Sequence, residues 1–226
     1  ETSPKTVYDW ESYIYADGDS DSDPQLTKYC NDSGLGITDA LTELETGDDA
    51  ATAILGSNWR MPTYDEVIEL RDYCEHVFTT QNGVAGTLVT GPNNQSIFMP
   101  AAAGRYYNNL ILSEGTGSYW SSSLDTDDPT KAQGLSLASD GFGTITSHRY
   151  FGLPIRPVYA PSNTASSNNT FTDNRDGKTY SYVTIGNQTW MAENLRYEGN
   201  IPLGSSTSTT EAYRYNPNDD ADNVAT

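Results

Sequence analysis

Positively charged residues are scarce in this chain of 226 residues. The 12 Lys and Arg stand against 31 Asp and Glu, so the formal net charge is −19. A surface of that sign repels nucleic-acid phosphates and anionic lipid headgroups, which argues against both as partners. Long apolar runs are missing too: hydrophobic residues make up 35% of the chain, and no run approaches the roughly 18 residues of a membrane helix. The sequence predicts no nucleic-acid binding and no direct membrane insertion.

Cysteine and histidine are also scarce, with two of each. Cys30 and Cys74 allow either one disulfide, in an oxidising compartment, or two free thiols. His76 is expected at the end of a helix, where the negative pole suits it, and His148 stands alone in an expected strand. Neither histidine supports a Ser/His/Asp arrangement. We therefore predict that the protein is not an enzyme.

Aromatic and turn-forming residues are abundant instead. The chain has 16 Tyr and 4 Trp, enough for a packed core with a polar, aromatic surface. Its 19 Gly and 11 Pro indicate short strands joined by loops. Little Lys together with much Tyr, Thr, Asn and Asp is typical of secreted proteins, so we expect an extracellular location.

Two helices are expected in the first half of the chain. Asp48 and Asp49 are acidic residues that suit a helix N-terminus, and Gly56 suits the end of that helix. Thr63 and Glu66 form a capping box, in which each side chain satisfies an exposed amide of the other residue. We place the second helix at about residues 63–76, with apolar positions at helical spacing.

Beyond residue 80 the pattern favours short β-strands. We expect strands at 87–90, 96–99, 118–122, 133–138 and 143–148, with turns at 81–83, 91–94 and 139–141. Because Pro154 and Pro157 cannot donate to a central ladder, we expect residues 154–159 at an edge or end of a sheet.

The chain divides into three parts. Residues 1–160 form a main block, residues 161–170 are a polar linker, and residues 171–226 begin with a meander of strands at 171–173, 178–185 and 188–191. The last part, about 56 residues long, is too small to bury a core alone. It needs a partner, and the main block is the obvious one.

Several motifs carry a resemblance to a known family. Trp59–Thr63 (WRMPT), Tyr119–Ser123 (YWSSS) and Ile155–Val158 (IRPV) occur in an order that resembles the Fibrobacter succinogenes major paralogous domain family. Ile185–Leu195 (IGNQTWMAENL) resembles the N-terminal signature of that family. The resemblance implies an α+β, C-type-lectin-like fold similar to that of formylglycine-generating enzymes, with two helices, small antiparallel sheets and long loops. It also implies that the protein is located on the cell surface of a Bacteroidetes-like bacterium.

The order of the two parts is reversed relative to the family. Here the N-terminal signature follows the rest of the pattern. The chain either ends one truncated module and begins another, or is a circularly permuted unit, or supplies residues 171–226 to a neighbour in a tandem array. Each incomplete sheet needs a pairing partner, which its own chain or a neighbour can supply. We predict that this contact is carried by Phe171, Tyr180, Tyr182 and Trp190.

An acidic run is the best candidate for a metal site. Asp17, Asp19, Asp21 and Asp23 offer the hard oxygens that Ca²⁺ prefers, on a bendable loop. The run is not an EF-hand, because Lys28 stands where the closing glutamate belongs, and a solvated acidic loop is the alternative. The Glu-Pro-Asn, Gln-Pro-Asp and Trp-Asn-Asp motifs of sugar-binding C-type lectins are absent.

Other aromatic and basic residues divide into surface and core candidates. Tyrosine gives rigid, amphipathic contact area, so we predict ligand contacts at Tyr106, Tyr107 and Tyr150. The tryptophans are expected mostly in the core. We expect Arg60 and Arg156 to pair with buried acids or carbonyls. In the formylglycine-generating enzymes the reactive cysteines line the catalytic cleft. Cys30 and Cys74 match non-catalytic parts of the family pattern, so we do not expect that activity here.

The function that these observations predict is architectural. We expect a non-enzymatic module, a structural or assembly unit of a filament or tandem-repeat surface protein, whose partners are copies of itself or adjacent repeats. The alternative is an adhesin domain that binds a glycan or a host or cell-surface protein, stabilised by Ca²⁺ as its only cofactor.

Overall fold

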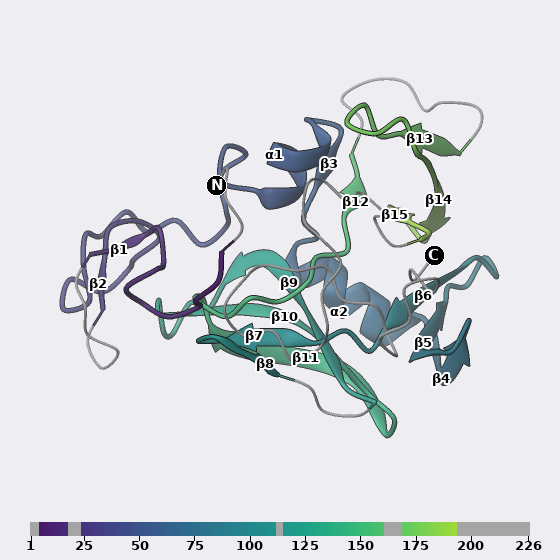
Figure 1. Ribbon diagram of the computed structural model, residues 1–226, viewed down its shortest axis with the longest axis horizontal. Coiled ribbons are helices and arrows are strands. Elements are labelled where there is room, and N and C mark those ends of the chain that lie inside the picture. Colours follow the sequence, from purple (N-terminus) through teal and green to yellow (C-terminus); the bar gives the residue numbers. More distant parts are fainter. Residues whose placement is uncertain (1–4, 18–23, 112–114, 161–168, 194–226) are drawn as a thin grey trace.

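The computed structural model describes residues 5–17, 24–111, 115–160 and 169–193 (Figure 1). These residues form two helices and several small antiparallel sheets, an α+β architecture in which strands predominate. None of the described helices is long and apolar enough to cross a membrane.

Both helices begin at the caps that the sequence predicts. α1 (Ala50–Leu55) has Asp49 as its N-cap, whose carboxylate accepts a hydrogen bond from the Thr52 amide at 2.8 Å, and it ends at Gly56 with φ +89°. α2 (Tyr64–Tyr73) begins with the complete capping box of Thr63 and Glu66. The local signals therefore place both helix starts correctly.

The end of α2 differs from the prediction. The helix stops at Tyr73, and residue 75 already belongs to β4 (Glu75–Gln81). His76 is therefore a strand residue, and the explanation of it as a residue at the negative end of a helix is wrong. Its Nε2 lies 2.9 Å from the carbonyl oxygen of Leu70. The last turn of α2 therefore contacts the imidazole ring through its backbone.

Two three-stranded sheets make up the centre of the main block. β4, β5 (Val84–Thr90) and β6 (Ser96–Pro100) form one, whose first turn has Asn82 and Gly83 at φ +50° and +81°, as an Asn-Gly hairpin requires. β9 (Gly117–Leu124), β10 (Lys131–Ala138) and β11 (Gly141–His148) form the other, and α2 packs against it. The predicted strands and turns of this region are confirmed.

Smaller strand pairs lie around this centre. β1 (Ala16–Asp17) pairs with β2 (Gln25–Leu26), and β7 (Gly104–Tyr106) pairs with β8 (Asn109–Ile111). The β1–β2 pair lies at the opposite end of the molecule from β4–β6 (Figure 1).

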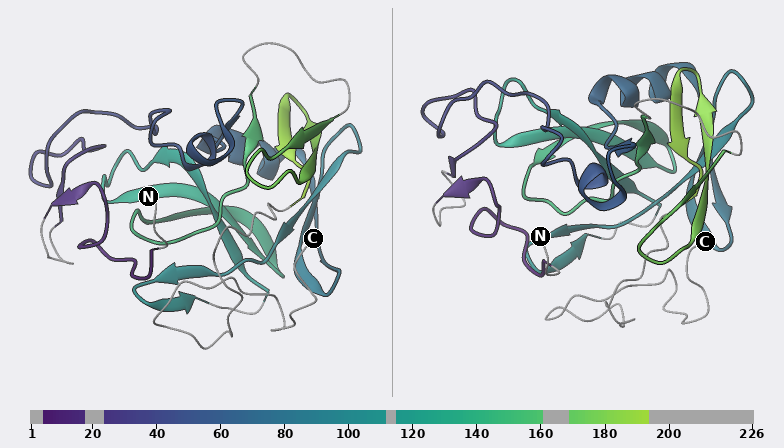
Figure 2. Two further views of the ribbon diagram at one scale, coloured as in Figure 1. Left: turned by 45° about the horizontal axis from the view of Figure 1, so that its top comes forward. Right: turned by 90° about the horizontal axis from the view of Figure 1, so that it is seen from above.

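A five-stranded sheet joins the two parts of the described chain. Its order is β13 (Thr170–Thr172), β14 (Thr179–Ile185), β15 (Gln188–Met191), β12 (Val158–Tyr159) and β3 (Trp59–Arg60). The meander predicted after the linker is confirmed, although β13 starts at residue 170, the last of the expected linker. β13–β15 lie on the same side of the molecule as β4–β6 (Figure 2).

The prediction of an edge position for residues 154–159 is wrong. β12 lies inside the sheet, between β15 and β3. Only Val158 and Tyr159 are paired, and both prolines precede them. The ladder therefore never needs the amide hydrogens that Pro154 and Pro157 lack.

The largest core cluster draws on both parts of the chain. Val67 and Leu70 of α2 and Val89 of β5 meet Ile185 and Trp190 of the segment after the linker. Of the three tryptophans in the family motifs, Trp59 and Trp190 are fully buried, as predicted, whereas Trp120 is half-buried. Trp10, which lies outside those motifs, is also fully buried. The described segment 169–193 is thus part of the core of its own chain.

Candidate assembly site

The strand pair β12–β15 is the backbone contact between the main block and segment 169–193. Val158 lies directly opposite Trp190, and the Met191 amide donates to the carbonyl oxygen of Pro157 at 3.3 Å. So short a ladder supplies few hydrogen bonds. Side chains must provide most of the contact.

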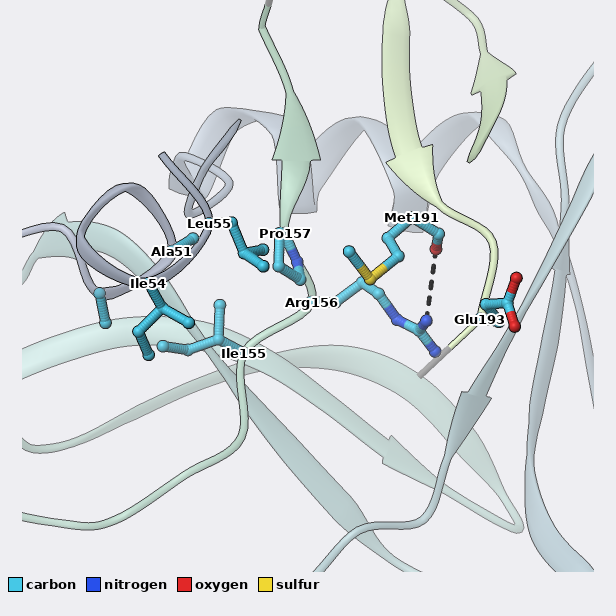
Figure 3. Close-up of a pocket in the computed structure, with 9 residues that line it drawn as sticks. Ala51, Ile54, Leu55, Ile155, Arg156, Pro157, Met191 and Glu193 are labelled. Atoms are coloured by element: carbon cyan, nitrogen blue, oxygen red, sulfur yellow. Dashed lines mark hydrogen bonds between the residues drawn. The ribbon is translucent and has the colours of Figure 1, made fainter. Parts of the chain in front are cut away.

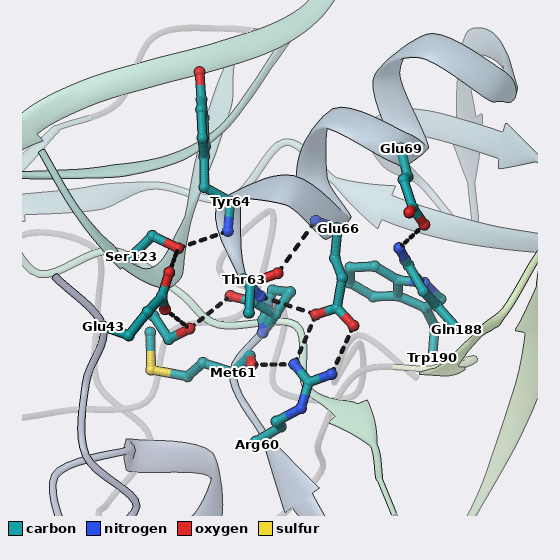
Figure 4. Close-up of polar contacts among 12 residues, drawn as sticks. Glu43, Arg60, Met61, Thr63, Tyr64, Glu66, Glu69, Ser123, Gln188 and Trp190 are labelled. Carbon is teal, nitrogen blue, oxygen red and sulfur yellow. Dashed lines mark hydrogen bonds and ion pairs between the residues drawn. The ribbon is translucent and has the colours of Figure 1, made fainter. Parts of the chain in front are cut away.

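A chain of hydrogen bonds ties Trp190 to helix α2 (Figure 4). The indole Nε1 of Trp190, 1% exposed, donates to the Gln188 side-chain oxygen at 2.9 Å. The Gln188 amide nitrogen in turn donates to the carboxylate of Glu69 on α2. A buried indole needs such a partner, because an unpaired N–H away from water is costly.

Arg60 lies in β3, which pairs with β12 on the side away from β15, and its side chain attaches β3 to helix α2. Its guanidinium makes two parallel hydrogen bonds of 2.6 Å to the Glu66 carboxylate and a third, of 3.0 Å, to the Met61 carbonyl (Figure 4). The hydrogen bonds with Glu66 raise the pKa of Arg60. Because Glu66 also accepts from the Thr63 amide at 2.9 Å, β3 and the start of α2 form one rigid unit.

Arg156 is buried between the main block and segment 169–193 and forms hydrogen bonds to both. Its guanidinium is buried and donates to the carbonyl oxygen of Phe98 in β6 at 2.6 Å. It also donates to the carbonyl oxygen of Met191 in β15 at 3.3 Å (Figure 3). Burial lowers the pKa of this guanidinium. The prediction that Arg156 pairs with buried carbonyls is confirmed, and one of those carbonyls belongs to the segment.

Aromatic contacts complete the junction. The Trp59 ring lies 5.3 Å from that of Phe171, and Tyr159 stacks on Tyr182 at 5.0 Å with an 18° interplanar angle. Tyr180 is fully buried in the same cluster. The four residues predicted to carry the assembly contact therefore all lie at this junction: Phe171, Tyr180, Tyr182 and Trp190.

A small hollow of about 100 Å³ opens beside Arg156 (Figure 3). Ile54 and Leu55 of α1, Ile155 and Met191 give it apolar walls, and Glu193 stands at one side. It is far smaller than a typical ligand pocket of roughly 300 Å³ or more. We regard it as a packing gap at the junction.

The predicted ligand-binding tyrosines meet in one aromatic cluster. Ring centroids lie 4.4 Å apart for Tyr106 and Tyr107 and 6.0 Å apart for Tyr106 and Tyr150. Tyr150 is 7% exposed and packs on Trp10 at 5.0 Å, so its prediction as a surface contact is wrong. Tyr106 and Tyr107 are half-buried and keep part of their surface in solvent.

The predicted calcium site falls mostly outside the described residues. Asp17 is exposed at the end of β1, while Asp19, Asp21 and Asp23 lie outside the part that the structure describes. Among the described residues no three His, Cys, Asp or Glu side chains gather as a metal site. Calcium binding stays a prediction.

The two cysteines are free thiols, the second of the two alternatives that the sequence allows. Cys30 is fully buried in the cluster around Trp10, whereas Cys74 is half-buried against the core cluster of α2. Burial raises the pKa of the Cys74 thiol.

Sequence reasoning missed the role of Arg149. This buried guanidinium donates to the carbonyl oxygens of Lys28, Tyr29 and Pro129 at 2.8–3.1 Å and to the Tyr13 hydroxyl at 3.0 Å. It thereby attaches the N-terminal loops to the turn before β10. No local pattern indicates this, because three of the four partners lie more than 100 residues away.

A second missed cluster lies beside these loops. Lys28 Nζ is 2.5 Å from carboxylate oxygens of both Asp48 and Glu45, and the Tyr29 hydroxyl donates to Asp48 at 2.5 Å. The cluster joins the loop at residues 28–29 to the approach to α1.

Comparisons with protein families, with curated proteins and with solved structures each find no match to this chain.

Proposed function

We propose that this chain is a non-enzymatic, C-type-lectin-like module of an extracellular bacterial surface protein, and that segment 169–193 links such modules. The observation that carries the proposal is the junction at β12. There a short segment after the linker contributes Trp190, Ile185 and the Met191 carbonyl to the core and to a buried arginine of the main block. A separate element that completes a core is how strand-exchange assemblies join their subunits.

The covalent connection permits either origin for the segment. Eight residues separate Ala160 from Asn169, and a connection of that length spans at most about 30 Å. In the structure the segment pairs with its own chain. In a polymer the same contacts would be made with the next copy, because both copies present identical groups at β12.

A crosslinking experiment distinguishes the two origins. Glu69 and Gln188 touch across the junction, so Glu69→Cys and Gln188→Cys are placed on separate chains with Cys74 replaced by Ala. Cys30 stays, since it is fully buried. The two kinds of chain are refolded together, and a short bismaleimide added to the folded mixture should join them. Filaments or an oligomer ladder should appear in electron microscopy and light scattering.

The matched control carries both cysteines in one chain. A crosslink that forms only in this double variant, together with a monomer of 24.7 kDa in light scattering, would overturn the assembly function. Deletion of residues 171–226 tests the same point independently. It should abolish polymers and destabilise the main block.

An adhesin role is the second candidate, favoured by the partly exposed pair Tyr106 and Tyr107 at the β7–β8 turn. These rings offer contact area to a glycan or protein. Under this alternative Ca²⁺ raises the melting temperature, and Asp19→Ala with Asp21→Ala removes the effect. An unchanged melting temperature would count against the calcium-stabilised form.

A further inference from the structure

The outer edge of β4 has no partner strand among the described residues. β4 is the first strand in the order β4–β5–β6, and it lies at the periphery of the molecule (Figure 1). Its inner edge pairs with β5 along its whole length, from Glu75 to Gln81, without a register shift. A strand in this position presents a row of backbone amides and carbonyls to any chain that can pair with them.

The hairpin geometry shows which backbone groups of β4 point outward. Across a two-residue turn such as Asn82-Gly83, the flanking residues Gln81 and Val84 form a hydrogen-bonded pair. Hydrogen-bonded and non-hydrogen-bonded pairs then alternate along the ladder. The residues that direct their amides and carbonyls away from β5 are therefore His76, Phe78 and Thr80.

A hydrogen bond on the far side of β5 supports this alternation. The Ala85 carbonyl accepts from the Ala101 amide at 2.8 Å, so Ala85 does not use that group for Thr80, which lies opposite it in β4. The outward backbone groups of His76, Phe78 and Thr80 have no backbone partner elsewhere in the part of the chain that the structure describes.

β4 also lacks the usual protection of an edge strand. Natural edge strands are commonly protected by lysine, proline or a bulge. The sequence of β4, EHVFTTQ, contains neither lysine nor proline, and its ladder with β5 has no bulge. Its solvent face is apolar instead: Val77 is 56% exposed and lies in register with the half-buried Leu88 and Phe98 of the next two strands.

The outward groups of β4 are complementary to those of a second β4. When two such strands pair antiparallel with Phe78 opposite the Phe78 of the other copy, His76 lies opposite Thr80. All the outward residues then form hydrogen-bonded pairs. The same register places Val77 opposite Thr79, and these two β-branched side chains pack well at a close, non-hydrogen-bonded position.

The charges of β4 also fit a second copy. Glu75 is the one acidic residue of this strand, and in the symmetric register it lies opposite the neutral Gln81. No two carboxylates of the paired strands therefore face each other, although the net charge of −19 makes whole copies repel at longer range.

We propose that β4 pairs with β4 of a second copy and forms one continuous antiparallel sheet across a two-fold axis. This contact does not depend on exchange of segment 169–193. The sheet meets the assembly junction at its other edge, where the Phe98 carbonyl of β6 accepts from Arg156. Modules linked through the segment would thereby also pair side by side.

A disulfide experiment tests the register. Val77→Cys and Thr79→Cys are placed on separate chains in which Cys74 is replaced by Ala, and the folded chains are mixed and mildly oxidised. The mixed disulfide should form, because Cβ atoms of such a pair lie about 4.5 Å apart. Val77→Cys alone is the matched control, since two residues 77 are not opposite each other. Equal dimer yields in the mixture and the control would overturn the proposal.

Sedimentation equilibrium of the full chain over a concentration series measures the association. Thr80→Pro should weaken it about tenfold, because the substitution removes an outward amide and leaves the ladder to β5 intact. Thr80→Ala keeps the amide and should have little effect. Added salt should strengthen the association by screening the repulsion between copies. A dimer that Thr80→Pro leaves unchanged would overturn the proposal, because the contact would then lie elsewhere.

Amide hydrogen exchange tests the edge directly. The amides of Phe78 and Thr80 should become protected as the protein concentration rises. Fast exchange at every concentration would mean that the edge stays unpaired, and protection at every concentration would mean that another part of the same chain covers it. Either result overturns the proposal.

The pairing of β4 and the linkage through segment 169–193 can fail separately. The crosslink between Glu69→Cys and Gln188→Cys chains involves no residue of β4. Thr80→Pro should therefore leave that crosslink unchanged while it weakens the β4 dimer.

Discussion

Val158 and Trp190 face each other across neighbouring antiparallel strands, although one closes the main block and the other lies in the segment after the linker. Each is 1% exposed, and both belong to the cluster built on Val67 and Leu70 of α2. The segment is therefore a structural part of the domain and not an appendage. The stability of the block should depend on it.

Trp190→Ala should lower the free energy of unfolding by about 3–5 kcal/mol, because it removes a fully buried indole and leaves a cavity. Urea denaturation followed by fluorescence of the remaining tryptophans measures this. Thr189→Ala is the control, since Thr189 is only half-buried and pairs with Thr184 away from the core. Similar losses in the two variants would contradict the role given to Trp190.

Arg156→Lys should destabilise the protein by about 2–3 kcal/mol. A lysine ammonium cannot reproduce the planar fork that reaches the carbonyls of Phe98 and Met191 together, and a buried charge without its hydrogen bonds is costly. The control is Arg71→Lys, whose partner is the adjacent, exposed Asp72. We expect less than about 0.5 kcal/mol there. An unaffected Arg156→Lys variant would mean that the bridge is unimportant.

Asp48 should contribute to the loss of stability in acid. Burial alone raises the pKa of its carboxyl group, but hydrogen bonds from Lys28, Tyr15 and Tyr29 outweigh burial and hold the pKa at about 2. The unfolded value is near 3.9. The folded pKa is the lower one, so the stabilisation is present above about pH 4 and lost as the pH falls to about 2.

The measurement is thermal unfolding of the wild type and Asp48→Asn across that acid range. The variant should start less stable at neutral pH and lose less stability between about pH 4 and 2. Tyr29→Phe, which removes one donor to Asp48, should shift the acid limb towards higher pH. Parallel curves for wild type and Asp48→Asn would exclude this role.

The two thiols should differ in reactivity. Cys30 is 0% exposed and should react with a thiol reagent only after unfolding. Cys74 is half-buried and its pKa is raised by burial, so it should react slowly at neutral pH and faster as the pH rises. Cys74 lies near Ile185 and Gln188 in one surface hollow, so Trp190→Ala should accelerate its labelling. An intact mass that changes on reduction would instead indicate a disulfide.

Local signals in the sequence predicted much of the fold. The caps at Asp49 and Thr63, the turn at Asn82-Gly83 and the meander after the linker each depend on residues within a few positions of one another. The apolar spacing continues through Cys74 and does not distinguish the helix from the strand that follows, so it places the end of α2 too late. Proline positions alone do not give the neighbours of a strand, so they do not predict the central position of β12.

Local sequence patterns predict the composition class, the helix caps, the turns and the four aromatic residues that lie at the junction between the main block and segment 169–193. Packing between distant segments sets which groups meet: Trp190 with Val158, Arg149 with the N-terminal loops, and Tyr150 with Trp10. The difference lies in how far apart the interacting residues are in the sequence. Caps and turns are fixed by hydrogen bonds between near neighbours, whereas burial and pairing depend on how distant segments pack, which no local pattern specifies.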